Sequence, residues 1–243
     1  MKHTIIEFKS LDSTSTYIKN NYASLDDGSV VTSITQTSGR GRLGRHWIDD
    51  GKSLLFSFLL KGKKYSSLLD SISLLSGAAM ELTLLDLGLS PLIKWPNDIY
   101  INDKKVCGIL TEGISSSSLE CIVVGIGLNL NNSFFEEGLN ATSIYLETKK
   151  EFDKKAILFS FLSNLDKLLE SEEKNPYSFS KIIAAHDYLK DKDIYLNYYG
   201  ENKFLHCLGI NSTGALLGKD EEGKLITVTS GEANVVTNLT RAI

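Results

Sequence analysis

Ten residues at positions 38–47, SGRGRLGRHW, combine three arginines with three glycines. Gly39, Gly41 and Gly44 have the G-x-G-x-x-G spacing of a dinucleotide-binding turn, which needs a strand before it, a helix after it and an acidic residue about 20 positions further on. A β-branched run precedes the glycines, but the segment after them is strand-like and the distal positions, KGKKYSS, are rich in lysine. The spacing therefore does not indicate a redox cofactor.

The arginines of this segment, which we call the arginine loop, favour anion binding. Guanidinium groups bind carboxylates and phosphates through paired hydrogen bonds, and glycines let the backbone turn its N–H groups towards a ligand. Taken alone, the loop fits equally well a solvent-facing basic segment that contacts RNA or nothing. The three cations are Arg40, Arg42 and Arg45.

A second group of polar residues lies in KWPNDIYINDKKVCGILTE, positions 94–112. Asn97 and Asp98 end one expected strand, and Lys105 follows across a hairpin. A lysine at the start of a buried strand is partly desolvated, whereas a lysine that extends its ammonium to the surface is the more common case. Asp98 could equally cap a turn, and Trp95 could be a core aromatic residue.

The third feature is GIGLNLN, positions 125–131, where glycines lie inside an expected strand. Glycine within a strand indicates either a bulge or the close approach of another group, such as a ligand. Asn129 and Asn131 follow on one face at the end of this strand.

Composition limits the classes of function. The chain has 243 residues, with 26 basic and 30 acidic side chains and a net charge of -4, so it has no general attraction for nucleic acid or anionic membranes. The three cysteines, Cys107, Cys121 and Cys207, are far apart and predict neither a disulfide framework nor a zinc site. The sequence shows no signal peptide and no apolar stretch of about 20 residues. We therefore expect a cytoplasmic protein without membrane contact.

Hydrophobic periodicity predicts strands and helices in two blocks. Strands are expected at 4–10, 29–37, 53–60, 91–98, 105–113 and 119–131, with a helix start in LDSTSTYIKNNYA, 11–23, and helices at 66–88, 152–171 and 177–189. A turn at Asn102–Asp103 and the serines at 115–118 predict two hairpins, and 131–143 is expected to be a long loop. Beyond residue 190, short strands separated by turn residues predict a small barrel. The expected domains are 1–190 and 191–243.

The motifs GRGRLGRHW, KWPND, KVCGILTE and GIGLNLN, in this order and spacing, resemble those of biotin protein ligases. The resemblance extends from LDSTSTY near residue 12 to the C-terminal segment. It implies an α+β fold, with a mixed sheet and flanking helices like those of class II aminoacyl-tRNA synthetases and a small C-terminal SH3-like β-barrel. The 1–190 domain would then be the catalytic biotin- and ATP-binding domain.

The resemblance also implies an ATP-dependent ligase that converts biotin to biotinyl-5′-AMP and transfers it to a lysine of a biotin carboxyl carrier protein domain, in acetyl-CoA carboxylase or a similar enzyme. ATP and Mg²⁺ would be required. A lipoate protein ligase is the alternative enzyme, and a non-catalytic RNA-binding module is the alternative of another class. Whether the protein forms a homodimer stays open.

Site residues follow from the resemblance by position. Those matching biotin contacts are Ser13, Thr14, Ser15, Gln36, Gly39, Arg40, Gly41, Arg42, Lys105 and Gly108. Those matching ATP or adenylate contacts are Arg40, Arg42, Arg45, Trp47, Asn97, Lys105, Asn129 and Asn131. The expected catalytic residues are Lys105, Arg40, Arg42 and Asp98, with Asp98 also the candidate Mg²⁺ ligand. Lys105 would act electrostatically on the reacting carboxylate and α-phosphate.

Further expectations follow from positions where the sequence departs from the family pattern and from one long loop. Leu43 interrupts the second arginine pair usual in the family, so Arg45 would reach the site alone or support the loop. The 131–143 loop corresponds to an adenylate lid, in which Phe134 or Phe135 would either cover adenine or make a hydrophobic contact within the loop. The catalytic LDST sequence begins at residue 11, which leaves no room before it for a helix-turn-helix domain, so we expect no DNA binding.

Overall fold

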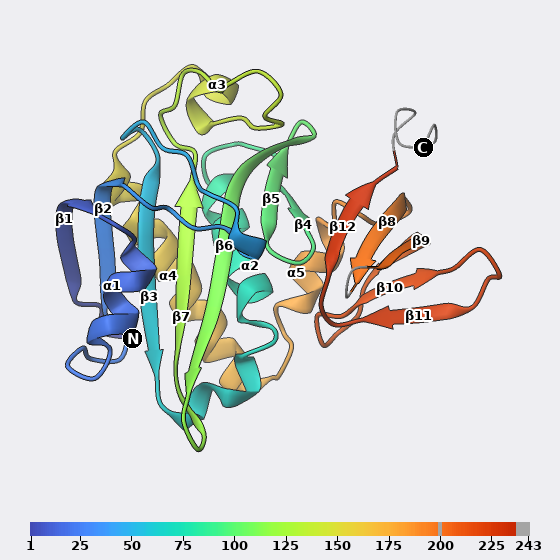
Figure 1. Ribbon diagram of the computed structural model, residues 1–243, viewed down its shortest axis with the longest axis horizontal. Helices are drawn as coiled ribbons and strands as arrows, with labels where there is room; N and C mark the ends of the chain where they lie inside the picture. The colour runs from blue at the N-terminus through green and yellow to red at the C-terminus, as the bar shows by residue number, and fades with distance from the viewer. Residues whose placement is uncertain (199–200, 237–243) are drawn as a thin grey trace.

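The computed structural model describes residues 1–198 and 201–236, and a seven-stranded mixed sheet is its main element (Figure 1). The strand order is β1-β2-β3-β7-β6-β5-β4, in which only the β1–β2 pair is parallel. The strands are β1 (Ile5–Leu11), β2 (Val30–Gln36), β3 (Leu54–Lys61), β4 (Leu92–Lys94), β5 (Asp98–Ile101), β6 (Lys104–Ser115) and β7 (Leu119–Leu128). The long predicted strand ending in GIGL is β7, at the centre of the sheet.

Helices cover both faces of this sheet. The helical elements are α1 (Thr14–Asn21), η1 (Arg42–Gly44), η2 (Lys63–Leu68), α2 (Ile72–Leu85), α3 (Ile144–Thr148), α4 (Lys154–Lys174) and α5 (Ser180–Ala185), of which η1 and η2 are 3₁₀ helices. Helices α2 and α4 pack on one face, and α1 packs on the other (Figure 1).

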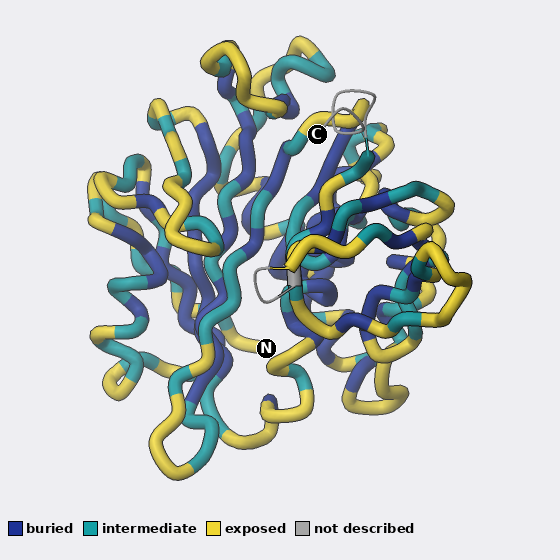
Figure 2. Tube along the Cα trace, turned by 45° about the vertical axis from the view of Figure 1, so that its right-hand side comes forward, coloured by how far each residue is buried: buried dark blue, intermediate teal, exposed yellow. Residues whose placement is uncertain are grey.

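The two faces explain the almost continuous apolar sequence of the central strands. Phe56 and Phe58 of β3 meet Phe161 of α4, with ring centroids 5.2 and 6.1 Å apart. On the opposite face, Leu59 packs with Ile18 of α1. Figure 2 shows these buried residues running along the strands, while the loop tips are exposed. A strand covered on both faces loses the polar alternation of a half-exposed one.

The C-terminal region forms a second, five-stranded antiparallel sheet. Its strands are β8 (Asp193–Tyr198), β9 (Glu201–Ile210), β10 (Leu216–Lys219), β11 (Leu225–Val228) and β12 (Glu232–Val235), in the order β11-β10-β9-β8-β12. Within the described residues, β11 and β12 do not pair, so the small barrel expected from sequence is an open sheet. Residues 199–200 and 237–243 of the predicted C-terminal domain lie outside the described residues.

Backbone and side-chain bonds join the second sheet to the first. The Ile93 N–H donates to the His186 carbonyl, and the Tyr188 N–H donates to the Ile93 carbonyl, so the connecting segment pairs with β4. The indole N–H of Trp95 donates to the Gly214 carbonyl at 3.1 Å. The division into domains at residue 190 stays a prediction, because one hydrophobic core continues across this junction.

Three expected elements differ in extent. The strand expected at 91–98 is split into β4 and β5, because Trp95 and Pro96 turn between them through a cis peptide bond. The helix expected at 66–88 begins at Ile72, after η2. The helix expected at 177–189 is the short α5, because residues 186–188 extend along β4 instead. The hairpins at 102–103 and 115–118 are present as predicted.

Two further observations concern the chain as a whole. None of the described helices has the length and apolar character needed to cross a lipid bilayer. All three cysteines are buried and carry free thiols.

The Trp95–Gly214 hydrogen bond leads to a prediction about stability. Trp95→Phe keeps an aromatic ring but leaves a buried carbonyl without its donor, so we expect the free energy of unfolding to fall by about 1–3 kcal/mol. Urea denaturation measures this. Trp47→Phe is the matched control, because the buried Trp47 indole N–H has no partner in the described residues. Equal losses in the two variants would contradict the assigned role of the bond.

Candidate functional site

A cavity of about 160 Å³ lies beneath the arginine loop, over the face of β6 and β7 that is on the same side of the sheet as α1. We call it the first cavity. From the N-terminal half, the predicted residues that line it are Ser13, Thr14, Ser15, Gln36, Arg40, Gly41, Arg42, Arg45 and Trp47. From the following strands they are Asn97, Asp98, Lys105 and Gly108. The structure therefore brings together residues that are up to 95 positions apart in sequence.

Neutral polar groups gather at the end of the cavity beside α1. Ser13 is the N-cap of this helix, and its hydroxyl accepts a bond from the Thr16 N–H. The Thr14 N–H donates to Oε1 of Gln36 at 2.7 Å. Hydroxyl-bearing residues at the start of a helix are typical of N-capping. Here the first residues of α1 also place polar side chains in the cavity.

The arginine loop is a narrow hairpin. The Trp47 N–H donates to the Gly39 carbonyl at 3.0 Å, and the Gly41 N–H donates to the Arg45 carbonyl at 2.7 Å. Gly39 itself is buried, and a Cβ there would lie 2.7 Å from the Trp47 carbonyl oxygen. At the tip, Leu43 in η1 has φ of 55°, an uncommon conformation for a residue other than glycine. As predicted, no α-helix follows the glycines.

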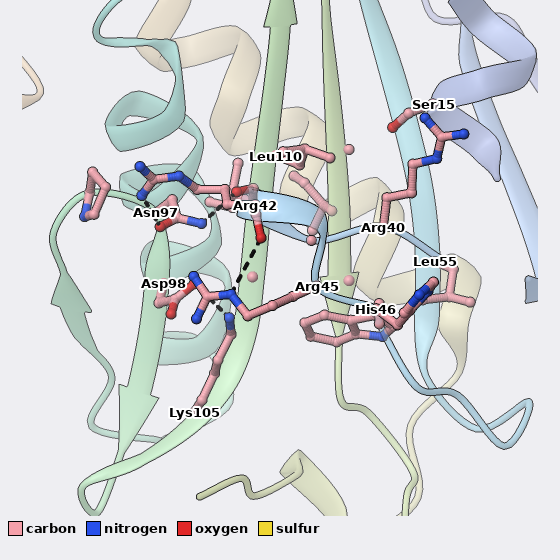
Figure 3. Close-up of a pocket in the computed structure, with 18 of the residues that line it drawn as sticks. Ser15, Arg40, Arg42, Arg45, His46, Leu55, Asn97, Asp98, Lys105 and Leu110 are labelled. Carbon is pink, nitrogen blue, oxygen red and sulfur yellow. Dashed lines mark hydrogen bonds and ion pairs between the residues drawn. The ribbon is translucent and has the colours of Figure 1, made fainter. Parts of the chain in front are cut away.

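The three arginines of the loop point in different directions (Figure 3). Arg40 extends towards Ser15, whereas Arg42 and Arg45 extend towards the side of Asn97 and Asp98 (Figure 3). Arg42 Nη1 donates to Asn97 Oδ1 at 3.1 Å. Burial lowers the pKa of Arg42 from its ordinary value.

The second sheet holds two of these arginines. Arg42 Nη2 donates to the Gly231 carbonyl at 2.9 Å, and Arg45 Nη1 pairs with Glu232 Oε1 at 2.7 Å. Arg45 both lines the first cavity and pairs with the second sheet, so the two roles expected for it from sequence stay predictions. Sequence reasoning missed Glu232, since nothing in a C-terminal segment of short strands indicates which carboxylate faces a loop about 190 residues earlier.

Lys105 and Asp98 form an ion pair, with Nζ and Oδ1 2.7 Å apart and both side chains partly buried. Asn97 lies beside them, and its Nδ2 donates to the Ile109 carbonyl at 2.8 Å. Within the described ranges 1–198 and 201–236, no three His, Cys, Asp or Glu side chains gather as metal ligands. Asp98 Oδ1 faces Lys105 Nζ in this structure, and the assignment of Asp98 as a Mg²⁺ ligand stays a prediction.

Glycines let side chains lie against the sheet. A Cβ on Gly127 would lie 2.6 Å from the Trp47 indole, and one on Gly108 would lie 2.9 Å from it. A Cβ on Gly125 would lie 2.4 Å from Ser15 Oγ. The pairing of β7 is regular through these positions, so the glycines mark close approach rather than a bulge. In this structure the approaching groups are Trp47 and Ser15.

A second cavity, of about 370 Å³, adjoins the first and shares Trp47 and Lys105 with it. Its wall includes Asn129 and the 131–143 loop, from which both Phe134 and Phe135 contribute. Asn131 is placed elsewhere: its Nδ2 donates to the Phe152 carbonyl and its Oδ1 accepts from the Phe152 N–H. Among the described residues, Asn132 lines this cavity instead.

Lys94 is a further residue that sequence reasoning missed. It lines the first cavity, and its Nζ donates to the Tyr100 hydroxyl at 3.3 Å. Burial lowers the pKa of Lys94. The sequence feature that could have indicated Lys94 is the motif KWPND, because this lysine is its first residue.

The arrangement can bring two anions together. The two cavities form a continuous site. The first cavity has a neutral polar end and a central group of cations, and the larger second cavity adjoins it. Lys105 lies at the boundary between the two cavities. Its ammonium is 5.7 Å from the centroid of the Trp47 ring, which lies against Gly108 and Gly127. Cations in such partly buried sites stabilise charge that develops during a reaction.

The amino-acid sequence is similar to a known protein family and to one of its curated relatives. A model of the biotin/lipoate A/B protein ligase family matches residues 7–129. The bifunctional ligase/repressor BirA of Bacillus subtilis (strain 168) is 28% identical over 228 residues, which are 91% of this chain and 67% of the relative.

Two solved structures are also similar. The biotin protein ligase from Aquifex aeolicus in complex with biotin and ATP has a TM-score of 0.85 and 31% identity, and the match covers 96% of this chain and 98% of that one. The biotin protein ligase from Leishmania major in complex with biotinyl-5-AMP has a TM-score of 0.60 at 21% identity, over 93% of this chain and 99% of that one, and shows likeness of fold alone.

The ion pair between the loop and the second sheet leads to a prediction. Glu232→Gln removes the charge that holds Arg45, so we expect trypsin to cleave the arginine loop about two- to fivefold faster, as fits the loss of an exposed pair. Timed proteolysis followed by mass spectrometry measures this. Glu201→Gln, which breaks the Lys203 pair on the same sheet, is the control. An unchanged cleavage rate in Glu232→Gln would show that the pair does not restrain the loop.

Proposed function

The chain belongs to the biotin/lipoate A/B protein ligase family, and we propose that its two cavities bind biotin and ATP side by side. The enzyme is an ATP-dependent biotin–protein ligase. The observation that carries the placement of the substrates is the boundary between the cavities, where Lys105 and Trp47 belong to both. A carboxylate in one cavity and a phosphate in the other would meet at this lysine.

The polar end of the first cavity suits the bicyclic head of biotin. Thr14, Ser15 and Gln36 offer hydroxyl and amide groups, which match a urea better than the sulfur ring of lipoate, because sulfur is a weak hydrogen-bond acceptor. The valeryl chain would then run beside the Trp47 indole, which itself lies against Gly108 and Gly127. This orientation directs the biotin carboxylate towards Lys105.

The second cavity suits the nucleotide. It is the larger of the two, and its wall combines the side chains of Phe134 and Phe135 with the buried amide of Asn129. Aromatic rings stack on bases, and an asparagine amide can donate to or accept from their edges. The triphosphate would extend towards Lys105 and the arginines.

In the first step, a biotin carboxylate oxygen attacks the α-phosphorus of ATP, the bond to the β-phosphate bridge breaks, and pyrophosphate leaves with biotinyl-5′-AMP still bound. Both reactants are anionic, so their approach requires cancellation of charge. At about 4 Å, with an effective dielectric constant near 20, one cation attracts one anion by about 4 kcal/mol. We propose that Lys105, at the boundary between the cavities, supplies this attraction. Arg40 extends towards Ser15 and would have to turn towards Lys105 to add to it (Figure 3).

In the second step, the amine of the carrier lysine attacks the carbonyl carbon of the mixed anhydride and AMP leaves. We propose a biotin carboxyl carrier protein domain as this partner. Asp98 is placed beside Lys105 and would orient the incoming amine. An anhydride is sensitive to water, and closure of the 131–143 loop over the second cavity would protect it.

Mg²⁺ stays a proposal as a companion of ATP. Because Asp98 is engaged by Lys105, the ion would be held by phosphate oxygens and water rather than by a cluster of protein ligands. The RNA-binding alternative finds no support, because the family model and the similar solved structure point to a biotin protein ligase.

The cellular setting also stays a proposal. Buried, unpaired cysteines fit a reducing cytoplasm, where carrier domains would be accessible. We also keep the division into a catalytic domain, 1–190, and a C-terminal domain, 191–243, as a proposal.

Removal of Lys105 tests the first step. Lys105→Ala takes away a cation beside the reacting groups, so we expect biotin-dependent pyrophosphate release to slow about a hundred- to thousandfold. The adenylate is identified by mass after incubation with ATP, Mg²⁺ and biotin, with lipoate as the competing acid. The neighbouring Lys104→Ala should retain full activity, because Lys104 is exposed. Full activity of Lys105→Ala would remove the role assigned here.

Removal of an aromatic side chain tests the nucleotide cavity. Phe134→Ala should raise KM for ATP about tenfold and leave KM for biotin unchanged, because loss of base stacking costs about 1–3 kcal/mol. Initial rates at varied ATP and biotin separate the two constants. Phe159→Ala, at an exposed position on α4, is the control. A change confined to KM for biotin would assign the cavities the other way round.

A further inference from the structure

The polar end of the first cavity depends on a serine beneath it. Ser57 lies on β3 and is fully buried. Its hydroxyl is 2.7 Å from Thr14 Oγ1 and 2.8 Å from Ser15 Oγ. Thr14 Oγ1 is in turn 3.1 Å from Oε1 of Gln36. The four side chains form one chain of hydrogen bonds, Ser15–Ser57–Thr14–Gln36, which we call the hydroxyl relay.

Ser57 interrupts an otherwise apolar strand. The sequence of β3 is LLFSFLLK, and every other residue between Leu54 and Leu60 is a buried hydrophobic one. An apolar residue would satisfy packing at this position equally well. Opposite Ser57 in the sheet is Gly125, which leaves the room that Ser15 Oγ needs to reach it. Two neighbouring strands are therefore adapted to one pair of hydroxyls.

One end of the relay has a fixed orientation. A backbone N–H can only donate, so the Thr14 N–H at 2.7 Å identifies the facing atom of Gln36 as its carbonyl oxygen. The amide nitrogen of Gln36 then lies on the other side, towards Gly39 and the cavity. No hydrogen bond from this nitrogen occurs within the described residues, so it is free to donate to a ligand.

The fixed amide determines the direction of every proton in the relay. Gln36 Oε1 has no hydrogen, so the Thr14 hydroxyl must donate to it. That hydroxyl has one proton, so at its contact with Ser57 it accepts, and Ser57 donates. Ser57 in turn accepts from Ser15. The hydroxyl proton of Ser15 is therefore donated to Ser57, and only the lone pairs of the Ser15 oxygen are available to a ligand in the cavity.

The relay therefore presents two unlike groups to a ligand: an acceptor at Ser15 and a donor at Gln36. A cyclic urea carries the complement, an N–H donor next to a C=O acceptor. We propose that Ser57 is a positioning residue that fixes this polarity and so makes the first cavity selective for a urea N–H. This inference rests on the proposed function, because it takes biotin as the occupant, and it adds a residue that does not line the cavity.

Replacement of Ser57 tests the proposal through binding and polarity. In Ser57→Ala the Ser15 hydroxyl can rotate, so its oxygen is no longer held as an acceptor. We expect the Kd for biotin to rise about three- to tenfold, which corresponds to one net hydrogen bond. KM for ATP and kcat at saturating biotin should stay within about twofold, since an alanine changes nothing in the second cavity.

A matched pair of ligands tests the polarity itself. In two carbamate analogues of biotin, one or the other urea N–H is replaced by oxygen. The wild-type protein should bind the analogue with oxygen facing Ser15 about 10- to 100-fold more weakly than biotin, because two acceptors then face each other. In Ser57→Ala, Ser15 can donate to that oxygen, and this discrimination should shrink about tenfold. Isothermal titration calorimetry measures all these affinities without catalysis.

Ser76→Ala is the control, since Ser76 is fully buried on α2 and its hydroxyl has no partner in the described residues. It should bind every ligand as the wild type does, and thermal unfolding checks that both variants are folded. Equal discrimination in wild type and Ser57→Ala would overturn the relay, as would losses of ATP and biotin binding in parallel. Failure of the wild type to bind biotin would overturn the proposed function as well, so the two failures are distinguishable.

Discussion

The close approach of side chains to the sheet at Gly108, Gly125 and Gly127 is the constraint on which the site depends. At two of these positions a Cβ would enter the Trp47 ring, and at the third it would displace the Ser15 hydroxyl. An ordinary strand residue would raise the cavity floor by the height of its side chain. The glycines thus set the depth of the site, while the neighbouring apolar residues on the opposite face of the strands anchor it to the core.

Basic side chains of this protein are concentrated around one cavity, although the chain as a whole is acidic. The chain carries a net charge of -4, yet Lys94, Lys105 and three arginines gather around one cavity. Asp98 and Glu232 balance part of this charge in the structure. Such pairs keep cations in place at moderate desolvation cost, and an anionic substrate can exchange with the carboxylates. The second sheet therefore contributes contacts that hold two arginines of the first cavity.

Much of this arrangement could be predicted from the sequence because local patterns determine it. Apolar runs predicted the central strands, Ser13 predicted a helix start, and Asn102–Asp103 predicted a hairpin. The motif glycines indicated close approach, although not by which group. Contacts between distant segments could not be predicted: the bond from Arg42 to Gly231 and the inward position of Asn131 depend on tertiary packing. Ser57 was missed because its role depends on two partners about 40 residues away.

The bond between Arg42 and Gly231 also affects when the enzyme becomes complete. Its two residues are separated by 189 positions, so the arginine loop leaves the ribosome long before its partner strand exists. Until residues 231–232 have been added, the chain lacks both groups that hold Arg42 and Arg45. The contacts that fix the arginine loop can therefore form only after the second sheet has been synthesised.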